Sequence, residues 1–290
     1  MGHISYKLFS SSILNQYGTA TPHLNSQPLM SLFMILNISF LMLAHNVNSD
    51  AFEFPGFRLP NTKYITFEGD AFASDGVLKL TKTAYSAPLP NSAGRASYAE
   101  PVRLWDERTG ALAAFTTNFI FYVEPASSGS GLRGDGITFF IAPFISKIPQ
   151  NSTGGFLGLF SEDSAFNAYQ NQIVAVEFDS FANTWDPVAV SSHIGIDINS
   201  IVSTTTVPWR TGNNLNESIA FATVNYEAIT KNLTVLVSQG GQGVPHTTTR
   251  LSYVVDLRTI LPEWVRVGFS GATGLLVEQH TIYAWDFSIY

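Results

Sequence analysis

The chain has 290 residues, no Cys, 22 Gly and 14 Pro, and it carries a formal net charge of −7. The absence of Cys excludes a disulfide framework and a thiolate metal site. The acidic balance argues against nucleic acid as a partner, and the length is sufficient for one large hydrophobic core.

The first 49 residues differ from the rest because Lys7 is their only Lys, Arg, Asp or Glu. The apolar run over residues 30–44 is too short and too interrupted for a membrane span, and small residues precede Asp50. We therefore predict a secretory signal peptide over residues 30–49 behind an upstream extension over residues 1–29, with a genuine N-terminal anchor as the alternative. Entry into the secretory pathway predicts an extracellular or vacuolar location.

Short apolar or alternating runs, separated by Gly, Pro, Asn and Ser, recur from residue 50 onward, and no helical period is present. Many short strands with turn residues between them are typical of a β-sandwich or barrel. No linker-like stretch divides residues 50–290, so we expect one all-β domain. Examples of the predicted strands are Ala114–Val123, Gly136–Ala142, Ile173–Asp179, His193–Ile198, Ser218–Tyr226, Leu233–Ser238, Val265–Ser270 and Thr281–Tyr290.

Predicted secretion gives meaning to the Asn-X-Ser/Thr motifs, because N-glycans are added in that pathway. The candidate glycosylation sites are Asn151, Asn216 and Asn232. Asn37 carries the same motif but lies inside the predicted signal peptide, so we do not count it.

The strand predicted to end at Asp179 has an unusual charge pattern. Side chains two residues apart share one face of a strand, so Glu177 and Asp179 point the same way. Two like charges on an otherwise apolar strand repel each other and need compensation. A bound divalent cation is the simplest compensation.

The residues after this strand supply further oxygen ligands. Asp179 and Asp186 offer carboxylates, Asn183 offers an amide oxygen, and Phe181 can offer only its main-chain carbonyl. An all-oxygen set of this kind suits Ca2+. The alternative is a group of separate surface acids, which would leave the clustered charge uncompensated.

A second ion would use Glu177 together with His193, which lies seven residues beyond Asp186. The imidazole nitrogen suits Mn2+ or another divalent transition ion. Both ions would clamp a loop that apolar packing could not hold, and neither needs to be catalytic.

A jelly-roll glycoside hydrolase is the enzymatic alternative, because retaining β-glucanases carry the strand motif E-x-D-x-x-E. Glu177 and Asp179 match its first half, but Ala182 stands where the second glutamate belongs. Double displacement then has no acid/base residue, so we expect no enzymatic activity.

Two long motifs resemble the signatures of legume lectins. One spans residues 174–201 and the other spans residues 261–270, and weaker similarities extend the resemblance over residues 50–290. The resemblance implies a concanavalin-like jelly-roll β-sandwich with a flat back sheet, a curved front sheet and a small top sheet. It also implies reversible, non-catalytic binding of carbohydrate.

The resemblance further implies the roles of individual residues. The ion of the Mn2+ type would be held by Glu177, Asp179, Asp186 and His193, with Ser203 at the position that holds one of its waters. Ca2+ would be held by Asp179, Phe181, Asn183 and Asp186. The sugar would be bound by Asp135, Gly155, Phe181, Asn183, Leu275 and Leu276, with a cis peptide between Gly134 and Asp135.

The resemblance also bears on specificity and assembly. The run from Leu275 to Trp285 is as short as in members that bind mannose or glucose, so we expect those glycans and glycoproteins as partners. Family members commonly pair their back sheets, which predicts a homodimer or homotetramer. A lectin-like storage or defence protein with little sugar binding, and a truncated ectodomain of a lectin receptor kinase, remain as alternatives.

Overall fold

The computed structural model describes residues 51–84, 87–125, 133–187, 192–209, 219–240 and 247–290. The predicted upstream extension and signal peptide, together with Asn216, lie outside the described residues. Within these described ranges, no helix is long and apolar enough to cross a membrane.

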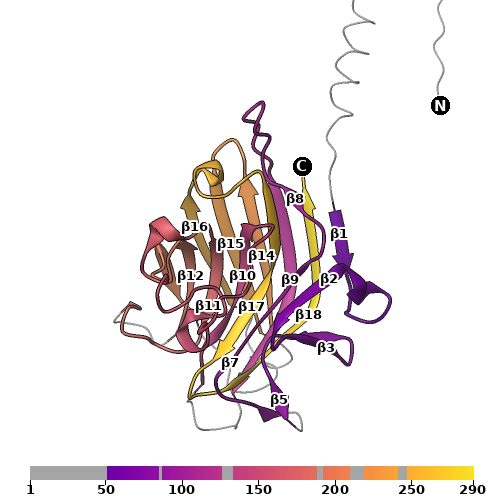
Figure 1. Cartoon of the computed structure of the whole chain (residues 1–290), viewed down its shortest axis with the longest axis vertical. Coiled ribbons are helices and arrows are strands. Elements are labelled where there is room, and N and C mark those ends of the chain that lie inside the picture. Colours follow the sequence, from indigo (N-terminus) through magenta and orange to yellow (C-terminus); the bar gives the residue numbers. More distant parts are fainter. Residues whose placement is uncertain (1–50, 85–86, 126–132, 188–191, 210–218, 241–246) are drawn as a thin grey trace, which may run out of the picture. The chain divides into compact units, whose positions relative to one another are not determined.

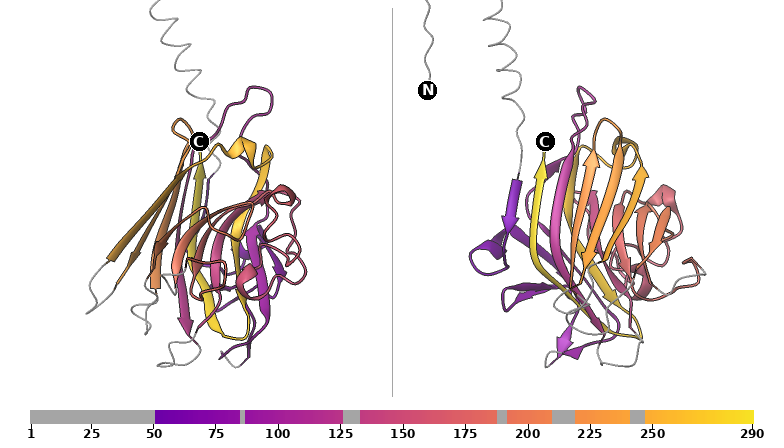
Figure 2. Two further views of the ribbon diagram at one scale, coloured as in Figure 1. Left: turned by 90° about the vertical axis from the view of Figure 1, so that its left-hand side faces the viewer. Right: turned by 180° about the vertical axis from the view of Figure 1, so that it is seen from behind.

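Two antiparallel β-sheets make up most of the described structure (Figure 1; Figure 2). Sheet A has the strand order β16 (Thr247–Val254), β15 (Asn232–Gln239), β14 (Ile219–Glu227), β9 (Phe115–Pro125), β18 (Glu278–Ile289), β4 (Val77–Lys79) and β3 (Phe72–Ser74), and β1 (Ala51–Phe54) also pairs with β18. Sheet B has the order β13 (Thr205–Pro208), β12 (His193–Ile198), β11 (Val174–Asp179), β10 (Gly136–Pro143), β17 (Trp264–Thr273), β7 (Ser92–Tyr98) and β2 (Ile65–Gly69), with β8 (Val102–Arg103) also on β17.

The remaining elements are short. Strands β5 (Thr83–Ala84) and β6 (Ala87–Pro88) form a two-stranded sheet. Four 3-10 helices lie in connections: η1 (Asn61–Tyr64), η2 (Gly154–Phe156), η3 (Ala168–Gln170) and η4 (Leu257–Thr259). The fold is therefore an all-β jelly roll with two large sheets and one small sheet, as predicted.

Sheet A faces the core with one side only, and its sequence shows why. In β15, Leu233, Val235 and Val237 are buried, whereas the residues between them are partly or fully exposed. This period of two places every second side chain against sheet B. Figure 2 shows strands β14, β9 and β18 of this sheet lying side by side in the right-hand view.

Sheet B is covered on both faces, so all six residues of β11 are buried. Val174, Val176 and Phe178 belong to the main core between the sheets, whereas Ala175 belongs to a second, smaller core cluster. Glu177 and Asp179 alternate with the main-core residues and therefore lie on the second face, as the strand pattern predicts.

The buried side chain of Arg95 holds the chain that covers this second face. Its Nε donates to the carbonyl of Gly158 over 2.7 Å, and its Nη2 donates to the carbonyl of Leu159 over 3.1 Å. Burial lowers the pKa of Arg95 to about 10, and the Glu68 carboxylate offsets part of that decrease. Arg95 thus fixes the segment that follows η2.

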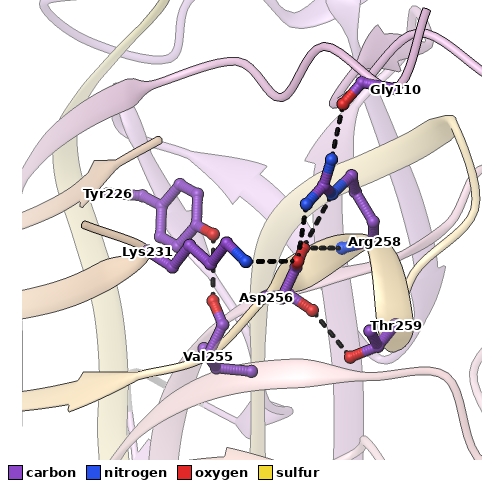
Figure 3. A network of polar contacts seen from close by, with 7 residues as sticks. All are labelled: Gly110, Tyr226, Lys231, Val255, Asp256, Arg258 and Thr259. Carbon is purple, nitrogen blue, oxygen red and sulfur yellow. Dashed lines mark hydrogen bonds and ion pairs between the residues drawn. The ribbon is translucent and has the colours of Figure 1, made fainter. Parts of the chain in front are cut away.

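A network of matched charges joins several loops at the end of sheet A (Figure 3). The Asp256 carboxylate contacts Lys231 Nζ at 2.8 Å and Arg258 Nη2 at 2.7 Å. Arg258 Nη1 also donates to the carbonyl of Gly110 over 2.6 Å. Nearby, the buried Tyr226 hydroxyl donates to the carbonyl of Val255 over 2.9 Å. The hydrogen bond from Arg258, followed by that from Lys231, holds the pKa of Asp256 well below its usual value.

Candidate functional site

Pairing of β11 with β12 brings three predicted metal ligands together. Asp179 pairs with His193, and Glu177 pairs with Gly195. One ligand atom each from Glu177, Asp179 and His193 lies within 4.8 Å of the others, and all three residues are buried. The structure thus brings these three side chains together.

Hydrogen bonds hold this cluster and add one acid that the sequence reasoning did not include. Glu177 Oε1 contacts His193 Nε2 at 2.9 Å and also accepts from the Ser203 hydroxyl. Ser203 contacts Asp197 Oδ1 at 2.6 Å, and Asp197 is fully buried. His193, Gly195 and Asp197 alternate along β12 in the same way as Glu177 and Asp179 do along β11, which is the signal that would have found Asp197.

A close approach explains the glycine in the middle of this cluster. A Cβ at Gly195 would collide with the Ser203 hydroxyl and with the Glu177 carboxylate. Only glycine leaves room for the two side chains to meet across β12. The contact between Ser203 and Glu177 therefore requires a glycine at position 195.

The cluster carries more negative charge than its protein partners can neutralise. Burial, and then the charge of Glu177, raise the pKa values of Asp179 and Asp197 well above their usual range. Burial lowers the pKa of His193, but its hydrogen bond to Glu177 and the charge of Glu177 outweigh that effect and raise it overall. Such a surplus of buried carboxylate fits a divalent cation.

The loop after β11 is folded by its own carboxylates. The main-chain N–H of Phe181 donates to Asp179 Oδ1 over 2.7 Å, and that of Asn183 donates to Asp186 Oδ2 over 2.5 Å. Burial raises the pKa of Asp186 to about 6. Within the described part of the chain, Asn183 Oδ1 and Asp197 Oδ2 are buried acceptors without a hydrogen-bond partner. An oxygen-rich site with such atoms fits Ca2+ beside a transition ion.

Asp135 lies beside this loop because of the register of β10. Gly136, which follows it, pairs with Asp179 at the end of β11. The main-chain N–H of Asp135 donates to Ala272 over 3.0 Å, and its carbonyl accepts from the N–H of Ser180 over 2.9 Å. The peptide between Gly134 and Asp135 is cis. The Asp135 main chain is thus held by both β17 and the end of β11.

Glycines from two other loops approach the carboxyl and amide groups. A Cβ at Gly155 would lie 2.5 Å from Asn183 Oδ1, and one at Gly274 would lie 3.1 Å from Asp135 Oδ2. A Cβ at Gly154 would lie 3.9 Å from Asp135 Oδ1. Four loops therefore converge at one place, and glycine permits the closest of these approaches.

An apolar wall lies next to these polar groups. Phe181 is 36% exposed although it lies close to buried acids. A Cβ at Gly134 would lie 3.3 Å from the Phe181 Cβ and 3.4 Å from the Leu276 Cβ, so these three residues are neighbours. Leu275 is 90% exposed at the tip of the same loop. Asp135, Gly155, Phe181, Asn183 and Leu276, which the resemblance assigns to the sugar site, thus lie close together.

The Asp135 carboxyl group combines burial with spare hydrogen-bonding capacity. Burial raises its pKa to about 6, although the backbone hydrogen bond from Gly274 acts in the opposite direction. Oδ2 of Asp135 is buried and has no hydrogen-bond partner in the described ranges. A buried acceptor without a partner costs free energy, so this atom suits a ligand that brings hydroxyl groups.

The two glycosylation candidates that can be located differ in setting. Asn151 is exposed in a turn with a φ of 55°. Asn232 is partly buried at the start of β15, and its Nδ2 donates to Thr234 Oγ1 over 3.1 Å. It alternates with inward-facing Leu233, so it lies on the outer face of sheet A.

The chain matches known proteins over nearly all of its described length. The family model for the legume lectin domain matches residues 49–290. The chain is 56% identical to Lectin 7 of Medicago truncatula over 270 residues, which cover 91% of this chain and 97% of that protein.

Solved structures agree with this match. Lectin UEA-II complexed with galactose is 42% identical, with a TM-score of 0.73, covering 83% of this chain and 98% of that chain. The metal-free form of lectin I-B4 from Griffonia simplicifolia is 39% identical, with a TM-score of 0.75, covering 83% of this chain and 99% of that chain.

Proposed function

The chain belongs to the legume lectin family, and we propose on this premise that its sugar site is the pocket around Asp135, held in shape by two metal ions. Members of this family bind carbohydrate without transforming it, so the chain is a carbohydrate-binding protein and not an enzyme. The observation that carries the proposal is the convergence of Asp135, Gly155 and Asn183, with unpartnered buried oxygens on Asp135 and Asn183.

The metal assignment rests on the donor set and its uncompensated charge. A transition ion of the Mn2+ type would be held by Glu177, Asp179, Asp186 and His193. Ca2+ would be held by Asp179, Asp186, Asn183 and the carbonyl of Phe181. The ions would neutralise buried carboxylates and fix the loop over residues 180–186. Ser203 contacts Glu177 directly, which supports its place beside the transition ion.

The sugar assignment follows from the groups that face the pocket. The Asp135 carboxylate accepts hydrogen bonds from sugar hydroxyls, and charged acceptors form the stronger bonds of this kind. The main-chain N–H of Gly155 and the amide of Asn183 add further polar contacts. Phe181 packs against the apolar face of the sugar ring. Main-chain amides of Leu275 and Leu276 complete the set.

Two sugar classes compete for this pocket. The short run from Leu275 to Trp285 favours glycans that contain mannose or glucose, and these are our proposed ligands. Solved complexes of similar lectins favour the other class: UEA-II with galactose, and the Bauhinia forficata lectin with GalNAc. Lectin I from Ulex europaeus has been solved with the methyl glycoside of α-L-fucose. A monovalent site with few hydrogen bonds would bind weakly, so we propose that effective binding uses several sites.

Assembly into a homodimer or homotetramer would supply that valency. Strand β1 at one edge of sheet A pairs only with β18 among the described strands, and an edge of this kind favours pairing with a second chain. A glycan on Asn232 would lie on β15, toward the opposite edge, and would leave β1 free. We propose that the protein enters the secretory pathway and reaches an extracellular or vacuolar location.

A glycan array tests the function directly. The purified protein is applied with Ca2+ and Mn2+, and again after chelation with EDTA. We expect binding to mannose- or glucose-containing glycans that chelation abolishes. Metal-dependent binding to galactose, GalNAc or fucose glycans would keep the mechanism and replace the specificity. Absence of binding in both conditions would contradict the proposed site.

A further inference from the structure

A chain of buried polar side chains reaches the Asp135 loop from β18. Oε1 of Glu278 lies 2.6 Å from the Ser180 hydroxyl and 2.9 Å from Nε2 of His280. Nδ1 of His280 lies 3.1 Å from the Thr81 hydroxyl. Three segments that are far apart in the sequence are thereby joined: the residues after β4, the start of β18 and the end of β11.

These side chains are nearly inaccessible. The exposed fraction is 0% for Glu278, 1% for His280 and Thr81, and 7% for Ser180. When Nε2 of His280 carries the proton, it donates to Glu278, and its Nδ1 accepts from Thr81, so each ring nitrogen has a partner. A buried carboxylate is costly even when it is paired, and apolar packing in its place often gives equal or greater stability.

Ser180 connects this network to the sugar site. Its main-chain N–H donates to the carbonyl oxygen of Asp135 over 2.9 Å, and its hydroxyl lies 3.0 Å from the same oxygen. The hydroxyl therefore lies between the Asp135 carbonyl and the Glu278 carboxylate. The hydroxyl has one hydrogen, which the Glu278 carboxylate and the Asp135 carbonyl share as alternative acceptors, while the Ser180 main-chain N–H also holds the Asp135 carbonyl.

This network shares no residue with the proposed metal ligands, but it lies next to them. Ser180 stands between Asp179 and Phe181 in the sequence, whereas Glu278, His280 and Thr81 include no proposed metal ligand. On the other side of Asp135, burial lowers the pKa of Arg133, and the Glu278 carboxylate offsets part of that decrease. The charge of Glu278 therefore also acts on Arg133.

We propose that Glu278 and Ser180 are positioning residues for sugar binding, which hold the Asp135 main chain independently of the metal ions. This inference rests on the proposed function of the Asp135 pocket. The pocket then has two supports, the metal-bound loop and the hydrogen-bonded chain from β18. Removal of the second support weakens sugar binding while both ions stay bound.

Four variants test the proposal. Ser180→Ala removes the hydroxyl, and Glu278→Leu removes both carboxylate oxygens at similar volume. Glu278→Gln keeps an oxygen that accepts from Ser180 and His280, so it serves as the conservative variant. Tyr226→Phe is the matched control, because it deletes one buried hydroxyl that donates to a carbonyl outside the proposed site.

Three quantities are measured on the metal-loaded protein. Calorimetric titration with methyl glycosides of mannose and galactose gives the affinity for whichever sugar the unmodified protein binds. Elemental analysis gives the bound Ca2+ and Mn2+. Amide hydrogen exchange of peptides covering residues 133–137 reports the positioning of the loop without any sugar.

We expect affinity about tenfold weaker for Ser180→Ala and Glu278→Leu, with unchanged metal content and faster exchange over residues 133–137. Glu278→Gln should stay within about threefold of the unmodified protein, and Tyr226→Phe should be unchanged in both affinity and local exchange.

Unchanged affinity and exchange in Ser180→Ala would overturn the proposal, as would loss of metal from that variant. If the unmodified protein binds neither glycoside, the proposed specificity or function fails separately. The exchange comparison then still decides whether Ser180 and Glu278 position the loop.

Discussion

Two charge clusters of this lectin differ in one decisive respect. The Asp256 carboxylate contacts both Lys231 and Arg258, and these contacts lower its pKa. Around β11, burial and neighbouring acids raise the pKa of Asp179 and of Asp197. The first cluster is complete within the protein, whereas the second needs positive charge from outside.

The difference separates a structural cluster from a functional one. Matched charges near the surface contribute modestly to stability and need no ligand. Unmatched buried charges destabilise a fold that holds no cation, so this cluster fits the proposed metal site. The predictions below disturb one cluster at a time and ask whether the other responds.

The largest effect is expected from Asp179→Ala. This change removes a carboxylate assigned to both ions, so metal affinity should fall by more than about a hundredfold and sugar binding should become undetectable. Elemental analysis and the glycan array measure the two losses together. Sugar binding that survives the loss of both ions would contradict the proposal that the ions hold the sugar pocket in shape.

Asp135→Asn should leave the ions in place while removing the charged acceptor for sugar. A hydrogen bond to a charged group contributes about 1.5–3 kcal/mol, so sugar affinity should fall by a factor of about 10 to 100. Calorimetric titration gives the affinity, and elemental analysis gives the metal content. An affinity within a few fold of that of the unmodified protein would contradict the assignment of Asp135 as a sugar-binding residue.

Lowering the pH should affect the sugar site at Asp135 and the cluster around Asp256 in different ways, without any mutation. The pKa of Asp135 is raised to about 6, so sugar affinity should fall as the pH drops through that value. A raised folded pKa means that this protonation favours the folded state. The depressed pKa of Asp256 has the opposite sign: its contribution to stability is present above about pH 4 and is lost as the pH falls further.

The measurement is sugar affinity and metal content at intervals between pH 8 and pH 5, with thermal unfolding at each pH. Metal content that falls together with the affinity would assign the effect to the ions. Affinity that is constant down to pH 5 would contradict the role of an Asp135 carboxylate with a raised pKa.

The smallest effect is expected from Asp256→Asn. Partly exposed ion pairs contribute little, so the free energy of unfolding should fall by about 1 kcal/mol and the melting temperature by about 2–4 °C. Sugar affinity and metal content should be unchanged. Thermal unfolding and calorimetric titration measure this difference, and a change in sugar affinity would connect the two clusters.

Much of the fold could be predicted from local patterns. Each of these eight predicted strands corresponds to an observed one. His193–Ile198 matches at both ends, and the others have ends shifted by a few residues; for example, Leu233–Ser238 was predicted and Asn232–Gln239 is observed. Alternating burial in such strands is a strong signal. The short strands β1 to β8 lack it, because most have only two to five residues and depend on pairing with distant strands.

The metal cluster was also accessible from sequence, since its ligands lie within seventeen residues between Glu177 and His193. Asp197 was missed although it follows His193 at a spacing of four residues on the same strand, which places both side chains on one face of β12. Glu278 and Ser180 carry no such signal. Their contact joins β18 to the end of β11, and nothing in the local sequence of either reveals the other.

The residues that converge on Asp135 come from the start of β10, from η2, from the loop after β11 and from the turn between β17 and β18. A growing polypeptide acquires these groups in that order, and it lacks the last of them until β17 has been synthesised. In the proposed sugar site, an incomplete chain therefore lacks the contribution of the turn between β17 and β18. The proposal thus makes sugar binding a property that the chain gains only after β17 and this turn have been synthesised.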